Sequence, residues 1–353
     1  MKRCEFSITI GNATLKSARH SAGHFLQTIL AVALMLFASH AGANPHGRCE
    51  SGGLNPGDII YTDSGDAIDG GFIVTVNRVT GQETVISHGG YLGRFGYPMG
   101  VVVDRTGQLI VANEACLLRI DPVTGEQILI RDIQGAPGGF WSLALDHNGD
   151  VLVAAETAIL RMDTLTGEMR VVSSGGYFTV VLGIAAGKSG DLFVTNVKYN
   201  PGVGWVGEII RVNPHNGRQT LISEGGYLTF LRGIAVVGDD IYVTGMATHD
   251  QNFGIGRVTH VDARTGIQSL VSEAENLICP VGITVDEAGK LIVADPYTIN
   301  PQSRDLYDGA LIGIDPDSGV QTMIVRGHSS VLNHCGVAIV PDWHRSTDKL
   351  LTK

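Results

Sequence analysis

The phrase Ile120-Asp121-Pro122-Val123-Thr124-Gly125 decides the fold, because related phrases recur along the chain. An Asp or Asn side chain bonds to backbone two residues on, Pro fixes φ and Gly accepts a positive φ, so the phrase predicts a tight turn between two strands. The closing glycines of the six copies are roughly 42 to 53 residues apart, which is the period of a four-stranded propeller blade. The other copies stand at residues 76–81, 162–167, 212–217, 261–266 and 314–319.

The residues around each phrase predict four short strands, which in the second copy are 100–104, 108–113, 117–120 and 127–130. The first copy begins at residues 57–63 without an inner strand, whereas an additional strand, 336–340, follows the sixth copy. Pairing these two segments would complete one blade and remove the exposed sheet edges. The sequence therefore predicts an all-β fold, a six-bladed β-propeller over residues 57–340 closed by pairing of the C-terminal strand into the first blade. Two separate β-sandwiches, the alternative, would not require six copies of one phrase.

The N-terminal residues 1–43 have the pattern of a secretory signal peptide. A basic region precedes an apolar run at 25–38, and Ala41-Gly42-Ala43 matches an A-x-A cleavage site. The run is shorter than the roughly 18 to 20 residues that span a bilayer, which makes a retained anchor the weaker alternative. We therefore predict an exported protein, periplasmic or secreted, with no membrane span after cleavage. The propeller would be flanked by an N-terminal segment, 44–56, and a polar tail, 341–353.

Composition and cysteine usage agree with this assignment. The chain has 47 Gly in 353 residues and a net charge of −10, which argues against a nucleic-acid-binding surface because that would need a basic footprint. An exported chain keeps Cys49, Cys116, Cys279 and Cys335 in a compartment that permits disulfides. Cys279 and Cys335 occupy nearly equivalent positions before two inner strands, so a bridge across the closing seam is predicted, while Cys49 and Cys116 are left either paired or free.

The blade pattern Gly282-Ile283-Thr284-Val285-Asp286, a Gly turn, Leu291-Ile292-Val293-Ala294-Asp295 and a final D-P-x-S/T-G hairpin resembles three groups of propellers. These are the NHL-repeat, the gluconolactonase-like (SMP-30-like) and the streptogramin-lyase-like proteins. The resemblance covers nearly all of residues 54–340 and implies the fold. Gluconolactonase-like enzymes have a metal-binding carboxylate just before an inner strand, but that column here holds no acid. It reads Met99, Trp141, Leu182, Arg232, Val281 and Cys335. The catalytic His column of the lyase-like proteins is approached only by His334, one residue early.

The loops predicted on one face of the propeller differ in length between copies. Copies four, five, six and one have long loops, whereas Asn113–Ala115 and Ala155–Ala158 are short, so the face is expected to contain a cleft. Gly-Gly-Tyr recurs at 89–91, 175–177 and 225–227 and predicts a turn from one blade to the next, with the tyrosine as an aromatic plug.

The last position of the second strand offers a hard oxygen in four of the six copies. These residues are Asp63, Asn113, Asn196 and Asp295. If they converged near the axis, they would suit Ca²⁺, which takes six to eight oxygen ligands, and such an ion would polarise an ester or lactone carbonyl. The alternative is that each Asp or Asn caps its strand by bonding to loop backbone.

Further candidates come from the same predicted face. Glu114 and Glu156 would act as general bases if burial raised their pKa, and His249 lies in a long loop suited to proton transfer. Arg94 and Arg232 precede inner strands and would hold a substrate carboxylate, while Trp205 and Tyr297 would supply an apolar wall. Each of these residues also fits a purely structural or solvent-exposed role.

Two functions are therefore expected from the sequence. One is a metal-assisted hydrolase or lyase that acts on a small ester or lactone, with Ca²⁺ as its cofactor. The other is a non-catalytic NHL-type platform that binds a peptide, glycan or extracytoplasmic protein.

Overall fold

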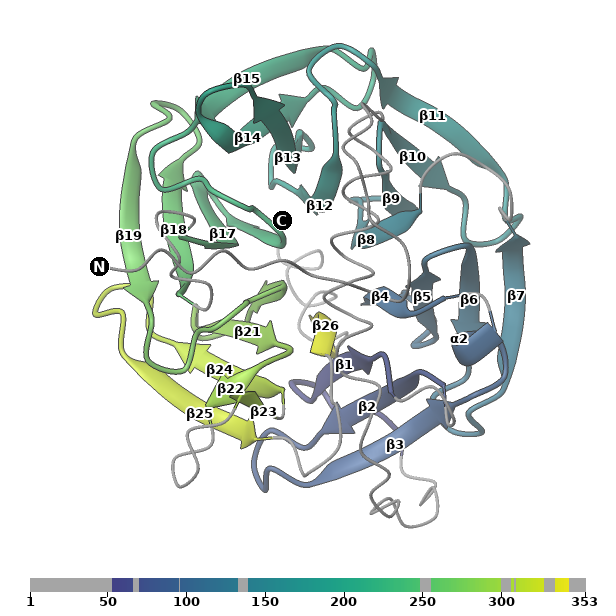
Figure 1. Cartoon of the computed structure of the whole chain (residues 1–353). Coiled ribbons are helices and arrows are strands. Elements are labelled where there is room, and N and C mark those ends of the chain that lie inside the picture. Colours follow the sequence, from purple (N-terminus) through teal and green to yellow (C-terminus); the bar gives the residue numbers. More distant parts are fainter. Residues whose placement is uncertain are drawn as a thin grey trace, which may run out of the picture. The chain divides into compact units, whose positions relative to one another are not determined.

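The computed structural model describes residues 53–65, 70–94, 96–132, 139–247, 255–299, 306–307, 309–326 and 334–342. They form six four-stranded antiparallel sheets arranged around one axis (Figure 1). The propeller lies within the unit Ser39–Lys353, and residues Met1–Ala38 lie outside the described part of the chain. The predicted six-bladed β-propeller is therefore confirmed. The predicted signal peptide and the tail after residue 342 lie outside the described residues and stay predictions.

The strands of each blade run from the axis to the circumference in the order given. Blade 1 contains β26 (His334–Ile339), β1 (Ile59–Asp63), β2 (Phe72–Val76) and β3 (Glu83–His88). Blade 2 contains β4 (Pro98–Val103), β5 (Leu109–Asn113), β6 (Cys116–Ile120) and β7 (Gln127–Asp132). Blade 3 contains β8 (Phe140–Leu145), β9 (Val151–Ala155), β10 (Ala158–Met162) and β11 (Met169–Ser174).

The second half of the ring follows the same order. Blade 4 contains β12 (Val181–Ala186), β13 (Leu192–Asn200), β14 (Gly204–Val212) and β15 (Gln219–Glu224). Blade 5 contains β16 (Ile234–Val237), β17 (Asp240–Met246), β18 (Gly256–Asp262) and β19 (Gln268–Glu273). Blade 6 contains β20 (Gly282–Val285), β21 (Leu291–Asp295), β24 (Ala310–Ile314) and β25 (Gln321–Arg326). Outside the blades lie the pair β22 (Thr298–Ile299) and β23 (Leu306–Tyr307) and the short helix α2 (Tyr91–Arg94).

The recurring phrase forms the predicted turn between the third and fourth strands of each blade. In blade 2 the Asp121 carboxylate accepts hydrogen bonds from the backbone N–H groups of Val123 and Thr124, both at 2.8 Å. Gly125 closes the turn with φ +71° and donates its N–H to the Asp121 carbonyl at 2.8 Å. These backbone donors stabilise the ionised carboxylate and lower the pKa of Asp121. The same turn is made by Asn77, Asp163, Asn213, Asp262 and Asp315.

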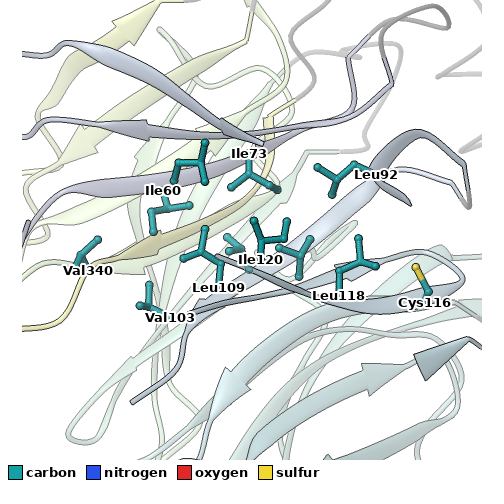
Figure 2. Close-up of a cluster of buried hydrophobic side chains, with 12 residues drawn as sticks. Ile60, Ile73, Leu92, Val103, Leu109, Cys116, Leu118, Ile120 and Val340 are labelled. Carbon is teal, nitrogen blue, oxygen red and sulfur yellow. The ribbon is translucent and has the colours of Figure 1, made fainter. Parts of the chain in front are cut away.

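Six clusters of buried aliphatic side chains fill the spaces between neighbouring blades, one at each junction. Figure 2 shows the cluster between blades 1 and 2, where Ile60 and Ile73 face Leu109, Leu118 and Ile120. Helix α2 adds Leu92 to this cluster. Because each sheet is covered on both faces, second strands such as β1, β5 and β21 are buried along their whole length, and the ring forms a continuous core.

Threonine hydroxyl groups connect neighbouring inner strands around the axis. The Thr195 hydroxyl accepts the N–H of Gly183 at 2.8 Å and donates to the Arg232 carbonyl of the next blade at 2.6 Å. Thr62 bridges Gly336 and Met99 in the same way, and Thr244 bridges Gly233 and Val281. The inner strands approach so closely that a Cβ added to Gly336 would lie 2.1 Å from the Met99 carbonyl oxygen.

The two ends of the propeller close the ring as predicted. Strand β26 pairs with β1 in antiparallel register, with Ile339 opposite Ile59 and Val337 opposite Tyr61. The Gly57 N–H donates to the Val340 carbonyl at 2.9 Å, just beyond the ladder.

A glutamine at the start of the fourth strand latches one blade to the preceding one. The Gln127 amide donates to Ser87 Oγ at 3.0 Å and to the Gly89 carbonyl at 3.1 Å, and it accepts the N–H of Tyr91 at 2.8 Å. Gln219, Gln268 and Gln321 make the equivalent bonds at three further junctions. The corresponding position is Glu83 in blade 1 and Met169 in blade 3, so among the described residues the junctions between blades 2 and 3 and between blades 6 and 1 lack this latch.

The Gly-Gly-Tyr segments form the predicted turns between blades, but in two of the three the tyrosine is not the plug, while Tyr91 in the first packs against the core. Tyr177 and Tyr227 are 46% and 42% exposed, whereas the residues that follow them, Phe178 and Leu228, are buried. The prediction placed the plug one residue too early, because the turn directs the tyrosine outward. No helix among the described residues has the length and apolar character needed to cross a membrane.

We expect Thr62→Val to lower the free energy of unfolding by about 1–3 kcal/mol, because it leaves the buried Gly336 N–H without its acceptor. Urea unfolding of the purified protein measures this change. Thr220→Val, on the exposed side of β15, is the matched control and should change the stability by less than about 0.5 kcal/mol. Equal effects of the two substitutions would contradict a stabilising role for the axial bridge.

Candidate functional site

We call the end of the propeller at which the inner strands begin the top face. It carries the turns between blades and the hairpins that join the second and third strands. The hairpins of blades 2 and 3 are as short as predicted, because β5 pairs with β6 up to Asn113 and Cys116, and β9 pairs with β10 up to Ala155 and Ala158. Blade 4 instead projects a long hairpin, in which β13 and β14 remain paired as far as Asn200 and Gly204.

A narrow cavity of about 80 Å³ opens on the axis at the top face. Its upper lining is the column of residues that precedes the inner strands, together with the glycines of those strands. These residues include Met99, Trp141, Leu182, Arg232, Val281 and Gly336. Arg232 is the one charged residue among the described residues that line it. The structure therefore places one of the predicted substrate-binding residues, Arg232, on the axis.

Two polar groups of this cavity have no hydrogen-bond partner within the described residues. The guanidinium of Arg232 makes no ion pair or side-chain hydrogen bond there, although the side chain is half-buried. The indole Nε1 of Trp141 is also buried without a partner. Buried donors are normally paired, so each unpaired donor requires an explanation.

An aromatic cluster lies at the long hairpin of blade 4. Tyr199 and Trp205 face each other across β13 and β14 with ring centroids 5.5 Å apart, and Trp205 lies 6.3 Å from Phe230. Tyr199 is 56% exposed, and Val203 at the hairpin tip is 71% exposed. The cluster contains the predicted wall residue Trp205, whereas Phe230 was not predicted. Phe230 adopts φ +44°, a conformation unusual for a bulky residue, and nothing in the local sequence signals it.

A buried charge network holds the base of this hairpin. Glu208 on β14 is only 1% exposed, accepts the Asn196 Nδ2 hydrogen bond at 2.7 Å and pairs with Lys198. Lys198 also bonds Glu224 at 3.0 Å, and these two carboxylates raise its pKa. Because both donors to the Glu208 carboxylate lie on β13, these bonds tie β14 to β13 at the base of the hairpin.

The four predicted metal ligands lie at the ends of their strands, but they bond to backbone. Asn196 accepts the N–H groups of Thr179 and Val180 at 2.8 and 3.0 Å. Asp63 accepts the Gly65 N–H at 2.8 Å, and Asn113 donates to the Tyr91 carbonyl at 2.6 Å. None of the four lines the axial cavity.

Asp295 also bonds to backbone, and among the described residues it accepts more backbone N–H groups than the other three do. Its carboxylate is fully buried and accepts the backbone N–H groups of Ile278 at 2.7 Å, Cys279 at 2.9 Å and Tyr297 at 2.9 Å. Burial nevertheless raises the pKa of Asp295 to about 7, against the opposing effect of these donors. No group of three or more His, Cys, Asp and Glu side chains within the described ranges is arranged to hold a metal ion. Calcium binding stays a prediction, and these contacts favour the alternative role of strand-end caps.

The predicted proton-transfer residues differ in their surroundings. Glu114 is half-buried, and burial raises its pKa against a backbone hydrogen bond from Tyr97. Glu156, in the equivalent hairpin of blade 3, has φ +36°, and its carbonyl accepts the Val181 N–H at 2.6 Å. His249 lies outside the described residues, so its predicted role is untested.

Two predicted substrate-binding residues lie away from the axial cavity or lack a described side chain. Arg94 ends helix α2, and its side chain lies outside the described part. Tyr297 follows Asp295 by two residues, bonds to it through its N–H and does not line the axial cavity.

Cys279 carries a free thiol in the structure, so the predicted bridge to Cys335 is not formed there. Burial is the largest cause that raises the pKa of the Cys279 thiol to about 12, while the nearby charge of Arg232 lowers it. The side chain of Cys335 lies outside the described residues.

A second, wider cavity of about 630 Å³ lies at the opposite end of the axis. Aliphatic side chains from the inner strands form its walls, and Asp286, Glu287 and Asp342 are the ionisable residues in its described lining. Asp286 is paired with Arg78 at 2.7 Å. The two ends of the axis therefore differ in charge, with a cation at the top and carboxylates at the bottom.

Comparisons with known proteins agree with this fold. No family model and no curated protein sequence matches the chain. Among solved structures, a chain of a nidogen/laminin complex superposes with a TM-score of 0.60 and 15% identity over 80% of this chain and 98% of that one. TolB from Acinetobacter baumannii gives a TM-score of 0.58 and 14% identity over 81% and 67%. Virginiamycin B lyase from Staphylococcus aureus gives 0.45 and 17% over 65% and 69%. The chain thus has the six-bladed propeller architecture that its sequence resembled.

We expect the free energy of unfolding to fall as the pH rises from about 4 to about 7, because the folded pKa of Asp295 lies above its unfolded value. Burial costs the carboxylate more than the neutral acid, and the three N–H donors offset only part of that cost. Asp295→Asn should remove this decrease, as measured by urea unfolding at pH 4.5 and 7.5.

Asp121→Asn provides the matched control, because the pKa of Asp121 is lowered in the folded state. Its contribution has the opposite sign and is lost as the pH falls through the folded pKa. A wild-type slope that Asp295→Asn leaves intact would rule out Asp295 as its source.

Proposed function

We propose that this protein is an exported binding propeller that recognises a peptide segment of a partner protein at its top face. The observation that carries the proposal is the distribution of exposed aromatic side chains. Within the described residues, the exposed aromatic side chains are four tyrosines, all of which lie on the top face. They are Tyr97, Tyr177, Tyr199 and Tyr227.

This distribution is typical of a recognition surface. Tyrosine and tryptophan are enriched in protein interfaces because a rigid ring gives a large contact area at low entropic cost. The hairpin of blade 4 adds a half-buried Trp205 beside Tyr199 and an exposed Val203 at its tip. An aliphatic tip favours a peptide over a glycan, because a peptide side chain can cover it with apolar atoms.

The other exposed face offers a different surface. The turns at the bottom carry isolated aliphatic residues such as Val79 and Leu165, which are 93% and 89% exposed. Isolated exposed aliphatic residues are common on protein surfaces and do not mark a site. The presence of all four exposed tyrosines therefore distinguishes the top face.

We expect the mature protein to enrich binders from a library of random decapeptides that are immobilised through their N-termini and keep free C-terminal carboxylates. Tyr199→Ala combined with Val203→Ala should weaken the best binder at least about tenfold, in keeping with the loss of an interface hot spot. Leu165→Ala, on the bottom face, should leave its affinity unchanged. Failure to enrich any peptide, or weakening by Leu165→Ala alone, would contradict the proposal.

A hydrolase or lyase acting on a small ester or lactone is the second candidate, and Glu114 is the observation that favours it. The pKa of its carboxyl group is raised by burial, and Glu114 Cγ and Trp141 Cε2 lie on either side of the same glycine, 3.4 and 3.8 Å from where a Cβ on Gly139 would stand. A carboxyl group of raised pKa on the same face as the cavity suits proton transfer.

Assay of a lactone and ester panel, with and without added Ca²⁺, tests this candidate. If the protein is such an enzyme, Glu114→Gln should lower turnover by a factor of about 10² or more, while Glu126→Gln, in an exposed turn at the bottom, should not. Turnover that Glu114→Gln leaves unchanged would exclude Glu114 as the proton-transfer group.

A further inference from the structure

We propose that the axial cavity of the top face is a receptor for one carboxylate group of the bound peptide, held by the guanidinium of Arg232 and the indole N–H of Trp141. This inference rests on the proposed function and specifies the chemistry that the ligand must present.

The first argument is the contrast between Arg232 and the other half-buried arginines. Each of those has a partner within the described residues: Arg161 pairs with Asp146 and Arg257 with Glu273, while Arg119 and Arg211 donate to carbonyl groups of the next blade. Arg326 also has an interaction. Arg232 alone in this class has no partner for its guanidinium, although partial burial makes an unpaired charge costly.

The second argument is that the backbone of Arg232 is fixed before any ligand binds. Its N–H donates to the Thr244 carbonyl at 2.9 Å, and its carbonyl accepts the Thr195 hydroxyl at 2.6 Å. Two blades therefore hold the residue from opposite sides. The point from which the side chain starts is therefore set before binding, and a guanidinium matches the planar geometry of a carboxylate.

The third argument is the second donor, Trp141, a residue that lines the same cavity from blade 3. Its Nε1–H is enclosed and unpaired within the described residues, so it reaches a ligand when the indole turns toward the cavity, and an indole nitrogen can only donate. A ligand that satisfies both Trp141 and Arg232 must therefore offer acceptor atoms and a negative charge.

The size and lining of the cavity select a carboxylate among anions. A volume of about 80 Å³ admits a small planar group but not a bulky one. Met99, Leu182 and Val281 surround the two donors with apolar atoms, which strengthens the electrostatic attraction. No acidic residue stands among the described lining residues to compete for Arg232. Two donor groups suffice for a carboxylate, whereas a phosphate would leave most of its oxygens without donors.

The carboxylate can come from a C-terminus or from an Asp or Glu side chain, and the experiment separates these sources. The best library peptide is compared with its C-terminally amidated form and with a form in which Asp and Glu are replaced by Asn and Gln. We expect one of the two changes to weaken binding at least tenfold. Arg232→Gln should weaken the unmodified peptide by a similar factor and abolish the difference between the forms.

Arg211→Gln is the matched control, because Arg211 is equally half-buried but already bonded. It should keep the preference for the carboxylate. If all three peptide forms bind alike to the wild type, or if Arg232→Gln retains the preference, the carboxylate receptor is overturned while peptide recognition stands.

A second measurement does not depend on any peptide. The chain contains three tryptophans, Trp141, Trp205 and Trp343, so the variant with Trp205→Phe and Trp343→Phe has Trp141 as its sole reporter. Sodium acetate should shift the fluorescence emission of this variant. Acetamide at the same concentration, and sodium chloride at the same ionic strength, should not. Adding Arg232→Gln should remove the response to acetate. Equal responses to acetate and acetamide would overturn the inference even if no library peptide binds.

Discussion

The hydrogen bond from a threonine hydroxyl to the backbone of two adjacent inner strands is the interaction on which the propeller axis depends. At each of three junctions, one hydroxyl accepts an N–H within its own blade and donates to a carbonyl of the next. Such a bridge requires close strands, and close strands require glycine, because a Cβ on Gly183 would lie 2.5 Å from the Arg232 carbonyl. The same contact therefore narrows the axial cavity and fixes the residue that supplies its charge.

The polar residues at the strand ends have a structural role, because they bond to backbone and do not line the axial cavity. Asn196 and Asp295 direct their oxygens at backbone N–H groups of the turn that leads into the inner strand. These bonds set where Leu182 and Val281, two wall residues of the cavity, begin their strands. The caps thus shape the site without touching a ligand, and the buried carboxyl of Asp295 makes that arrangement sensitive to pH.

The repeat phrase made the fold predictable, because Asp121, Pro122 and Gly125 specify a turn through local bonds alone. The closing pair, residues 57–63 with 336–340, followed from simple completion of a blade. The column that lines the cavity could also be read from the sequence. What could not be predicted was the partner of each polar group. Asp295 bonds to an N–H 16 residues earlier. Nothing in the local sequence shows that Arg211 bonds to the Ala263 carbonyl, while the side chain of Arg232 has no partner within the described residues. The exposure of Tyr177 similarly depends on a turn whose direction sequence does not reveal.

The glutamine latches divide the circumference unevenly. Gln219, Gln268 and Gln321 join blades 3 to 6 in series, Gln127 joins blades 1 and 2, and Glu83 and Met169 stand at the two remaining joints. Other contacts hold these two joints: Arg78 pairs with Asp286 between blades 1 and 6, and Arg119 donates to the Thr164 carbonyl between blades 2 and 3. Trp141 and Arg232 both belong to blades 3 to 6, which the glutamines join without a break. The spacing of these two residues therefore depends on neutral hydrogen bonds, which salt screens little, and not on the ion pair of Arg78.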